Sequence, residues 1–353
     1  MRRGRILGGL ALALSGLLLL WGDAARMPGA GADTGRMKNV EITEAPVISP
    51  PPVLHLPHVR PTLARDAGEP ESTTSPSVET PCPTPFVEEP PDSTPLPDGS
   101  LIRETTIAGG LSLRNETSYD PDLAAILADG PALRLSAEGP QLLIIHTHAS
   151  EAYTPAGLDR YVASDANRTE DDRFNVIRVG DELCAIYEQA GLRVIHDRGV
   201  YDYPSYTGSY ARTAAVIEQY LTDYPTLRAV IDLHRDALGG DGVVYKIMAE
   251  ESGVVASQIM LLCGTDASGL EHPNWLDNFS FALYLQDAVY QRYPTLMRPV
   301  ALVPQRYNQH LTAGSLILEV GSSGNTLQEA LAAIRLFGEA TAPSLLALVE
   351  TDR

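Results

Sequence analysis

From about residue 101 to its end, the chain alternates short apolar runs with longer amphipathic segments, and this alternation is its strongest constraint on the fold. The apolar runs, such as LLII at 142–145, have the length and composition of strands that are buried on both faces of a parallel sheet. The segments between them carry apolar residues at helical spacing. Strands that alternate with helices predict an α/β domain with a mostly parallel central sheet flanked by helices.

The expected elements can be placed from these patterns. The strands are expected at residues 141–145, 192–197, 227–236, 243–251, 257–264 and 315–321, with a further short strand within 101–120. The helices are expected at residues 121–131, 175–191, 210–225, 274–294 and 326–350. The helix at 175–191 has one apolar face and should stop at Gly191. That face is formed by Val179, Leu183, Ile186 and Tyr187.

The amino-terminal residues predict export across a membrane. The basic segment MRRGR is followed by an uncharged, mostly apolar run from Ile6 to Trp21. This run is slightly short for a spanning helix and slightly long for a signal-peptide core. The following GDAARM is a weak cleavage site, which favours a retained anchor over a cleaved signal. Because a basic flank stays cytoplasmic, we expect residues 1–24 to form a cytoplasmic tip and a single-pass anchor in the cell membrane, with the rest on the extracytoplasmic side.

Residues 25–100 are expected to form a disordered spacer between this anchor and one folded domain at 101–353. Between about residues 45 and 97 the spacer is dominated by Pro, Ser, Thr and acidic residues, which cannot bury enough apolar surface to fold. The whole chain carries 26 Lys and Arg against 45 Asp and Glu, a net charge of −19. Because such a chain repels a phosphate backbone, nucleic acid is not an expected partner.

Three polar clusters interrupt or follow the apolar runs. The first is the segment HTHASE at 146–151, the second is DLHRD at 232–236, and the third is Glu319 within SLILEVG. In open α/β sheets, ligands bind at the carboxyl ends of the strands. We therefore expect the three clusters to lie close together at one edge of the sheet.

No one of these clusters is specific, but their combination is typical of a zinc hydrolase. Such an enzyme needs three protein ligands, an open position for water, and a carboxylate that accepts the proton of the water. His148 and Glu151 form an H-x-x-E pair directly after a strand, and His234 can complete the set. Glu319 is the expected catalytic base, because a carboxylate in an apolar strand needs a charged or hydrogen-bonded partner. The sequence thus predicts a zinc ion held by His148, Glu151 and His234.

Neighbouring polar residues are candidates for supporting roles. His148 is preferred to His146 as a ligand because it fits the H-x-x-E pattern and lies beyond the apolar run. His146 is then expected beside a ligand or facing the substrate. Arg235 and Asn308 are candidates for substrate binding or oxyanion stabilisation, or for holding a loop together. Asp232 is expected to orient a ligand histidine.

The motifs resemble those of the stage II sporulation protein P family, the peptidoglycan hydrolases that act in the engulfment step of endospore formation. The resemblance covers essentially everything from about Leu101 onward. Its main matching segments are LLIIHTHASEAYTP, FNVIRVGDEL, IDLHRDA and YNQHLTAGSLILEVGSSGNTLQEA. An amino-terminal anchor and a polar spacer are also the layout of that family.

The resemblance implies a fold similar to the zinc-dependent N-acetylmuramoyl-L-alanine amidases. It implies amidase cleavage between muramic acid and the stem L-alanine, and endopeptidase cleavage of peptide cross-links. His148, Glu151 and His234 match the zinc positions, and Glu319 matches the catalytic glutamate of the amidases. Glu151 lies closer in sequence to the first histidine than it does in the amidases, which is nearer to the carboxypeptidase pattern. The implied partners are peptidoglycan and two sporulation proteins, D, a lytic transglycosylase, and M, a membrane protein.

Two other functions are compatible with the sequence. One is a zinc carboxypeptidase-like enzyme that only trims stem peptides. The other is a catalytically inert module that binds the wall or serves as a scaffold, against which the set of His148, Glu151, His234 and Glu319 argues. A metal-free α/β hydrolase is disfavoured because the sequence has no G-x-S-x-G elbow.

Overall fold

The computed structural model describes residues 101–350, with the exception of residues 108 and 241. The expected anchor at 1–24 and the expected spacer at 25–100 lie outside the described residues. The description that follows therefore concerns the expected folded domain.

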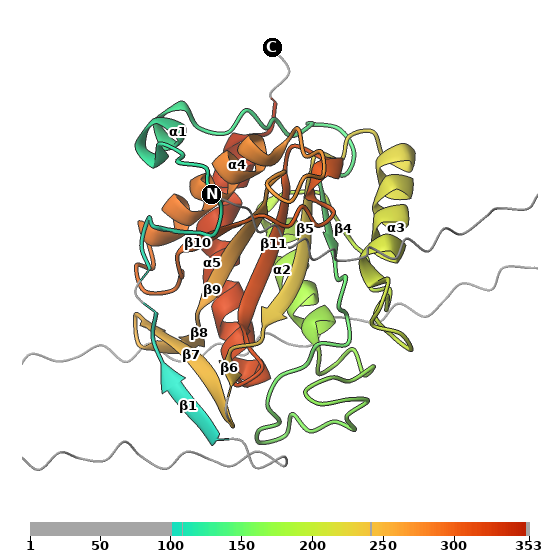
Figure 1. The fold of residues 1–353 in the computed structure, drawn as a ribbon, viewed down its shortest axis with the longest axis vertical. Helices are drawn as coiled ribbons and strands as arrows, with labels where there is room; N and C mark the ends of the chain where they lie inside the picture. The colour runs from blue at the N-terminus through green and yellow to red at the C-terminus, as the bar shows by residue number, and fades with distance from the viewer. Residues whose placement is uncertain (1–100, 108, 241, 351–353) are drawn as a thin grey trace, which may run out of the picture. The chain divides into compact units, whose positions relative to one another are not determined.

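A seven-stranded sheet forms the centre of this domain (Figure 1). Its strand order is β2 (Leu113–Asn115), β10 (Val300–Val303), β9 (Ile259–Gly264), β11 (Ser315–Ser322), β5 (Ala229–Asp236), β3 (Leu142–Ile145) and β4 (Val194–His196). Every neighbouring pair is parallel except β9 and β11, which are antiparallel. The mostly parallel sheet is confirmed, but it consists of two parallel blocks that run in opposite directions.

A smaller sheet combines the first strand of the described chain with residues 239–257. In it, β7 (Val243–Glu251) pairs with β1 (Leu101–Thr105), β6 (Gly239–Gly240) and β8 (Val254–Ser257). Strands β7 and β8 form a hairpin whose two connecting residues, Ser252 and Gly253, both have positive φ. This turn geometry matches the twist of a two-stranded hairpin. The strand β8 was not expected from the sequence, because its apolar residues were not separated from those of β9.

Helices cover both faces of the central sheet. The expected helices are all present as α1 (Leu123–Asp129), α2 (Val176–Ala190), α3 (Ser209–Asp223), α4 (Trp275–Tyr290) and α5 (Leu327–Ala347), and η1 (Gln309–Leu311) is a short 3₁₀ turn. Helices α2, α4 and α5 pack on one face of the sheet, and α3 packs on the other. Helix α2 ends at Gly191, as expected, where φ is 102°.

The alternation of side chains along each strand separates the two faces. In β3, Leu142 and Ile144 join the large core under α2 and α5, whereas Leu143 and Ile145 pack under α3. This period of two follows from the strand geometry. This alternation therefore decides which polar residues of a strand lie on the same face and can belong to one site.

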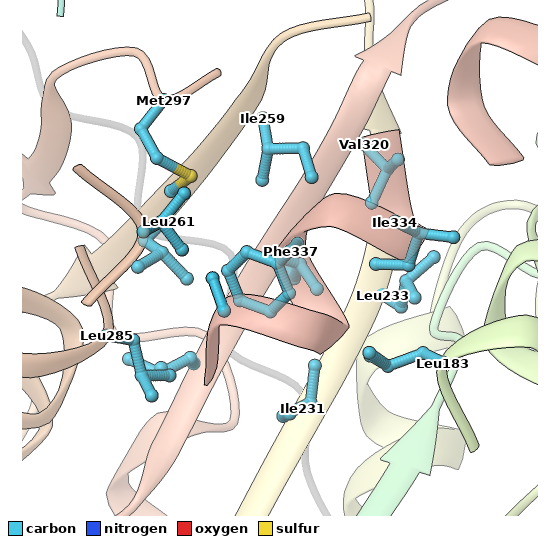
Figure 2. Packing of buried hydrophobic residues seen from close by; sticks show 14 of the residues in the cluster. Leu183, Ile231, Leu233, Ile259, Leu261, Leu285, Met297, Val320, Ile334 and Phe337 are labelled. Atoms are coloured by element: carbon cyan, nitrogen blue, oxygen red, sulfur yellow. The ribbon is translucent and has the colours of Figure 1, made fainter. Parts of the chain in front are cut away.

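Helix α5 is the main helix of the core. Figure 2 shows its Phe337 and Ile334 among side chains from the strands, such as Leu261 and Leu233. Within the described chain it is also the one helix that is long and apolar enough to cross a membrane. Because most of it is buried against the sheet and α2, its apolar composition is that of a core helix.

Replacement of Phe337 by alanine should lower the free energy of unfolding by about 3–5 kcal/mol, because the side chain is fully buried. Leu158, which is 97% exposed, is the matched control, and its replacement by alanine should change stability by less than about 0.5 kcal/mol. Denaturant unfolding followed by circular dichroism measures both. Equal effects of the two substitutions would contradict the core assignment.

Candidate functional site

The pairing of β5 with β11 brings two of the polar clusters together. His234 and Glu319 are direct neighbours in the parallel register, so their side chains point to the same face. That face also carries Asp232 and Ile317 and is the face covered by α3. The amino end of α3 therefore lies over the site.

The loop that follows β3 contributes His148 and Glu151 to the same region. The ring of His148 lies 5.2 Å from that of His234, centroid to centroid. Its Nδ1 lies 3.4 Å from the hydroxyl of Ser209 at the start of α3. Burial, together with the charge on His234, lowers the pKa of His148 to about 4. His148 is therefore neutral near pH 7, which is the form that binds a metal.

His234 lies between two carboxylates. Its Nδ1 is 3.4 Å from Glu151 Oε2, and its Nε2 is 2.9 Å from Asp232 Oδ1. Burial opposes protonation, but the two carboxylates outweigh burial and raise the pKa of His234 well above its ordinary value. Burial also favours the neutral form of Glu151, yet Arg235 and His234 lower the pKa of that carboxyl to about 2. Asp232 thus contacts His234, and it also accepts hydrogen bonds from the amide and hydroxyl of Thr147.

Glu319 is a carboxylate with little to neutralise it. Its Oε2 is buried and has no hydrogen-bond partner among the described residues. Burial, reinforced by the negative charges of Asp236 and Glu151, raises the pKa of Glu319 to about 8. A carboxyl group with such a pKa can accept and return a proton near neutral pH.

The donor set matches the chemistry of a zinc site, although the atoms do not yet converge. Oε2 of Glu319 is buried and has no hydrogen-bond partner within the described chain, and the two ring nitrogens of His234 face the carboxylates of Glu151 and Asp232. Two imidazoles and a carboxylate are a common zinc ligand set. Between residues 101 and 350, leaving out 108 and 241, no three His, Cys, Asp or Glu side chains are arranged to hold an ion as they stand. Binding would require the side chains of His148, Glu151 and His234 to adjust.

His146 lies on the other face of the sheet. It continues the alternation of Leu142 and Ile144, so it points toward α2. One ring nitrogen lies 2.9 Å from the carbonyl oxygen of Leu233, and the other lies 2.9 Å from Nε2 of His196. His146 is fully buried, and burial together with His196 lowers its pKa to about 3. The structure thus separates His146 from His148.

Arg235 and Asn308 are both engaged with the backbone. Arg235 donates from Nε to the carbonyl of Ala152 and from Nη2 to that of Asn167, and its amide donates to Glu151 Oε2. Asn308 donates to the carbonyl of Tyr210 at 2.9 Å. These contacts hold loops in place around the site, which is one of the roles expected for the two residues.

Three residues at the site were not selected from the sequence. The ring of Tyr206 stacks on His148 at 4.4 Å, and the ring of Tyr210 meets it edge-on at 5.3 Å. The guanidinium of Arg168 lies 3.4 Å from Glu151 Oε1. The tyrosine-rich segment 201–210 was the available signal for the first two, because aromatic residues form only 6% of the chain. Arg168 had no local signal, since its partners lie elsewhere in the sequence.

The fold and the site together define an α/β protein with a histidine- and carboxylate-lined centre at the strand ends. The family model for stage II sporulation protein P (SpoIIP) matches residues 88–342. The chain belongs to this family.

A curated relative is similar to part of the chain. It is stage II sporulation protein P of Bacillus subtilis (strain 168), 24% identical over 214 residues. The match covers 56% of this chain and 49% of the relative, so the chain spans about half the length of the relative that it matches.

Solved amidases are similar at low identity. N-acetylmuramoyl-L-alanine amidase AmiC2 of Nostoc punctiforme is 14% identical with a TM-score of 0.34, and the match covers 60% of this chain and 98% of that one. The amidase Ami1 of Mycobacterium smegmatis is 13% identical with a TM-score of 0.37 and the same coverage. The catalytic domain of CwlV of Bacillus (Paenibacillus) polymyxa var. colistinus is 12% identical with a TM-score of 0.34, covering 58% and 98%.

The packing of His146 yields a test at Gly180 in α2. A Cβ atom at this position would lie 2.6 Å from Nε2 of His196 and 2.7 Å from Nε2 of His146. Gly180→Ala should therefore destabilise the protein by about 1–3 kcal/mol. An ordinary helical glycine would instead gain about 1 kcal/mol from this substitution. Thermal unfolding measures the sign.

The His196→Ala background provides the control for this substitution. Removal of one imidazole makes room for the added methyl group, so Gly180→Ala should cost less there than in the parent protein. A stabilising effect in the parent protein would contradict the close packing.

Proposed function

We propose that this chain is a zinc-dependent peptidoglycan hydrolase of sporulation, an N-acetylmuramoyl-L-alanine amidase with additional cross-link endopeptidase activity that acts in engulfment. The observation that carries the proposal is the register pairing of His234 with Glu319, whose buried Oε2 has no hydrogen-bond partner among the described residues. Membership of the stage II sporulation protein P family supports the same conclusion. Peptidoglycan is the proposed substrate.

In this proposal His148, Glu151 and His234 hold the zinc ion. Asp232 orients His234, which it contacts at 2.9 Å. Bound zinc supplies positive charge that polarises the scissile carbonyl and acidifies the attacking water. His234 is protonated between its two carboxylates, so it would have to lose a proton to serve as a zinc ligand.

Glu319 performs the proton transfers. Its carboxylate accepts the proton of the attacking water and returns it to the leaving amine. Burial in its apolar strand raises the pKa of Glu319, which makes its ionised form a stronger base than a free glutamate.

The proposed location is the extracytoplasmic side of the cell membrane. Residues 1–24 are the proposed single-pass anchor and residues 25–100 the spacer, so the domain that begins at residue 101 reaches the wall. Sporulation proteins D and M are the proposed partners, on the basis of the family resemblance alone.

Glu319→Gln should lower hydrolysis of purified sacculi by about 10²–10⁴-fold, because the amide cannot accept the proton. Zinc content should stay unchanged, since the side chain keeps its size and is not a proposed ligand. Dye release from labelled sacculi and elemental analysis measure the two quantities. Solubilisation at the parent rate by a zinc-loaded variant would remove Glu319 as the base.

His234→Gln should lower bound zinc from about one ion per chain to nearly none, because one of three ligands is lost. His310→Gln is the matched control, since His310 lies on η1 outside the proposed ligand set, and it should keep its zinc. Elemental analysis of both purified variants measures the metal. Equal zinc in the two variants would remove His234 from the ligand set.

The released products decide among the alternative functions. An amidase frees lactyl-muramic sugar ends from intact stem peptides, whereas a carboxypeptidase-like enzyme releases single amino acids. An inert wall-binding module releases neither. The purified chain is incubated with sacculi, with and without a chelator, and mass spectrometry identifies the bonds that are cut.

A further inference from the structure

Arg168 is fixed beside the proposed ligand Glu151 by the backbone. The two residues form an isolated antiparallel bridge. On either side of it, Thr169 donates its amide to the carbonyl of Ser150 and Ala152 donates to that of Asn167. The loop of residues 154–168 therefore leaves and returns at the site, and Arg168 is at its returning end.

The two ends of the Arg168 guanidinium face different environments. Nη1 donates to Asp202 Oδ2 at 2.7 Å and to the hydroxyl of Ser150 at 3.0 Å. The side chain of Asp202 is 0% exposed, so this end is anchored in the interior. Nη2 makes only a long contact, 3.4 Å, with Glu151 Oε1. The side chain of Arg168 keeps 19% of its surface exposed.

Among the described arginines at the site, Arg168 has guanidinium N–H groups that are not fully used in hydrogen bonds. Arg235 uses its guanidinium on backbone carbonyls, and Arg298 is paired with Asp236 at 2.7 Å. The Nε of Arg168 donates to no atom of the described residues, and Glu151 already has His234 and the Arg235 amide as neighbours. Nε and Nη2 together form the edge that binds a carboxylate through two hydrogen bonds.

The ring of Tyr206 borders the space beside the Arg168 guanidinium and forms its wall. The ring lies between the two parts of the site, stacked on His148 at 4.4 Å and 5.0 Å from the Arg168 guanidinium carbon. The residue is 57% exposed, so its outer edge is open to solvent. An anion that reached Arg168 would thus lie beside the proposed metal ligands.

We propose that Arg168, with Tyr206 as its wall, forms a subsite for a free carboxylate of the peptidoglycan stem peptide. This rests on the proposed function, because peptidoglycan is the substrate that brings such carboxylates to the site. The carboxylates of Glu151 and Asp232 repel an anionic substrate, so the positive charge of Arg168 determines where the substrate carboxylate binds. Arg168 is a specificity-determining residue in this arrangement.

The rival role for Arg168 is to neutralise the buried Asp202. Substrate chemistry separates the two roles. Soluble muropeptides are prepared with all stem carboxylates free, or with each carboxylate amidated in turn. Cleavage rates and binding by calorimetry are then measured for the parent chain, Arg168→Gln, Arg168→Lys and the control Arg160→Gln, an exposed arginine of the same loop.

Amidation of one particular carboxylate should weaken binding to the parent chain by about 10–100-fold, and kcat/KM should fall by the same factor. For Arg168→Gln, binding and kcat/KM on the peptide with the free carboxylate should fall by this factor. Amidation of that carboxylate should then cause no further decrease. Arg168→Lys should regain part of this factor, and Arg160→Gln should behave as the parent does. Zinc content and thermal stability of each variant identify losses that come from misfolding.

If Arg168→Gln loses the same factor on free and amidated peptides, the residue acts only through Asp202 and the subsite is wrong. If the parent chain cleaves but ignores amidation at every position, the subsite is also wrong, while the hydrolase proposal stands. If no variant cleaves but binding to the parent still depends on one carboxylate through Arg168, the subsite stands and the hydrolase proposal fails.

Discussion

The parallel pairing of β5 with β11 is the constraint on which the site depends. It places His234 and Glu319 side by side, on the face away from the main core. A slip of one residue would turn one of the two side chains into that core. The pairing is held by apolar residues on its other face, among them Leu233, Leu318 and Val320. The same apolar packing that stabilises the sheet therefore aligns the polar atoms of the site.

The carboxyl groups of the site differ in the number of oppositely charged or hydrogen-bonding neighbours that they have. Glu151 contacts His234, Arg168 and the amide of Arg235, and its pKa is lowered although it is buried. Within residues 101–350, Oε2 of Glu319 accepts no hydrogen bond, and burial raises its pKa despite the charge on His234. Two carboxyl groups in one site thus differ in protonation because their neighbours differ. In the proposed mechanism, Glu151 binds the cation and Glu319 transfers protons, which agrees with this difference.

The site combines segments that are far apart in the chain. The loop after β3, the tyrosine-rich segment before α3, and the strands β5 and β11 all contribute. Arg168 connects the first two, because it contacts Glu151 and the loop residue Asp202 and lies near Tyr206. Substitutions in this loop can therefore directly affect the positions of the proposed ligands. Such loops on a rigid sheet are where binding specificity commonly varies.

The sequence by itself determined the α/β class, the main strands and helices, and the meeting of the clusters at residues 148–151, 234 and 319, because periodicity and strand-end chemistry are local signals. It did not determine that β9 runs antiparallel to β11, nor that β8 and β10 exist, since short apolar runs do not specify their partners. Tertiary structure alone decided that His146 turns toward α2 and His196, and that Arg168 and Tyr206 join the site. Those contacts join residues far apart in the sequence, and they form only when the strands and loops have packed.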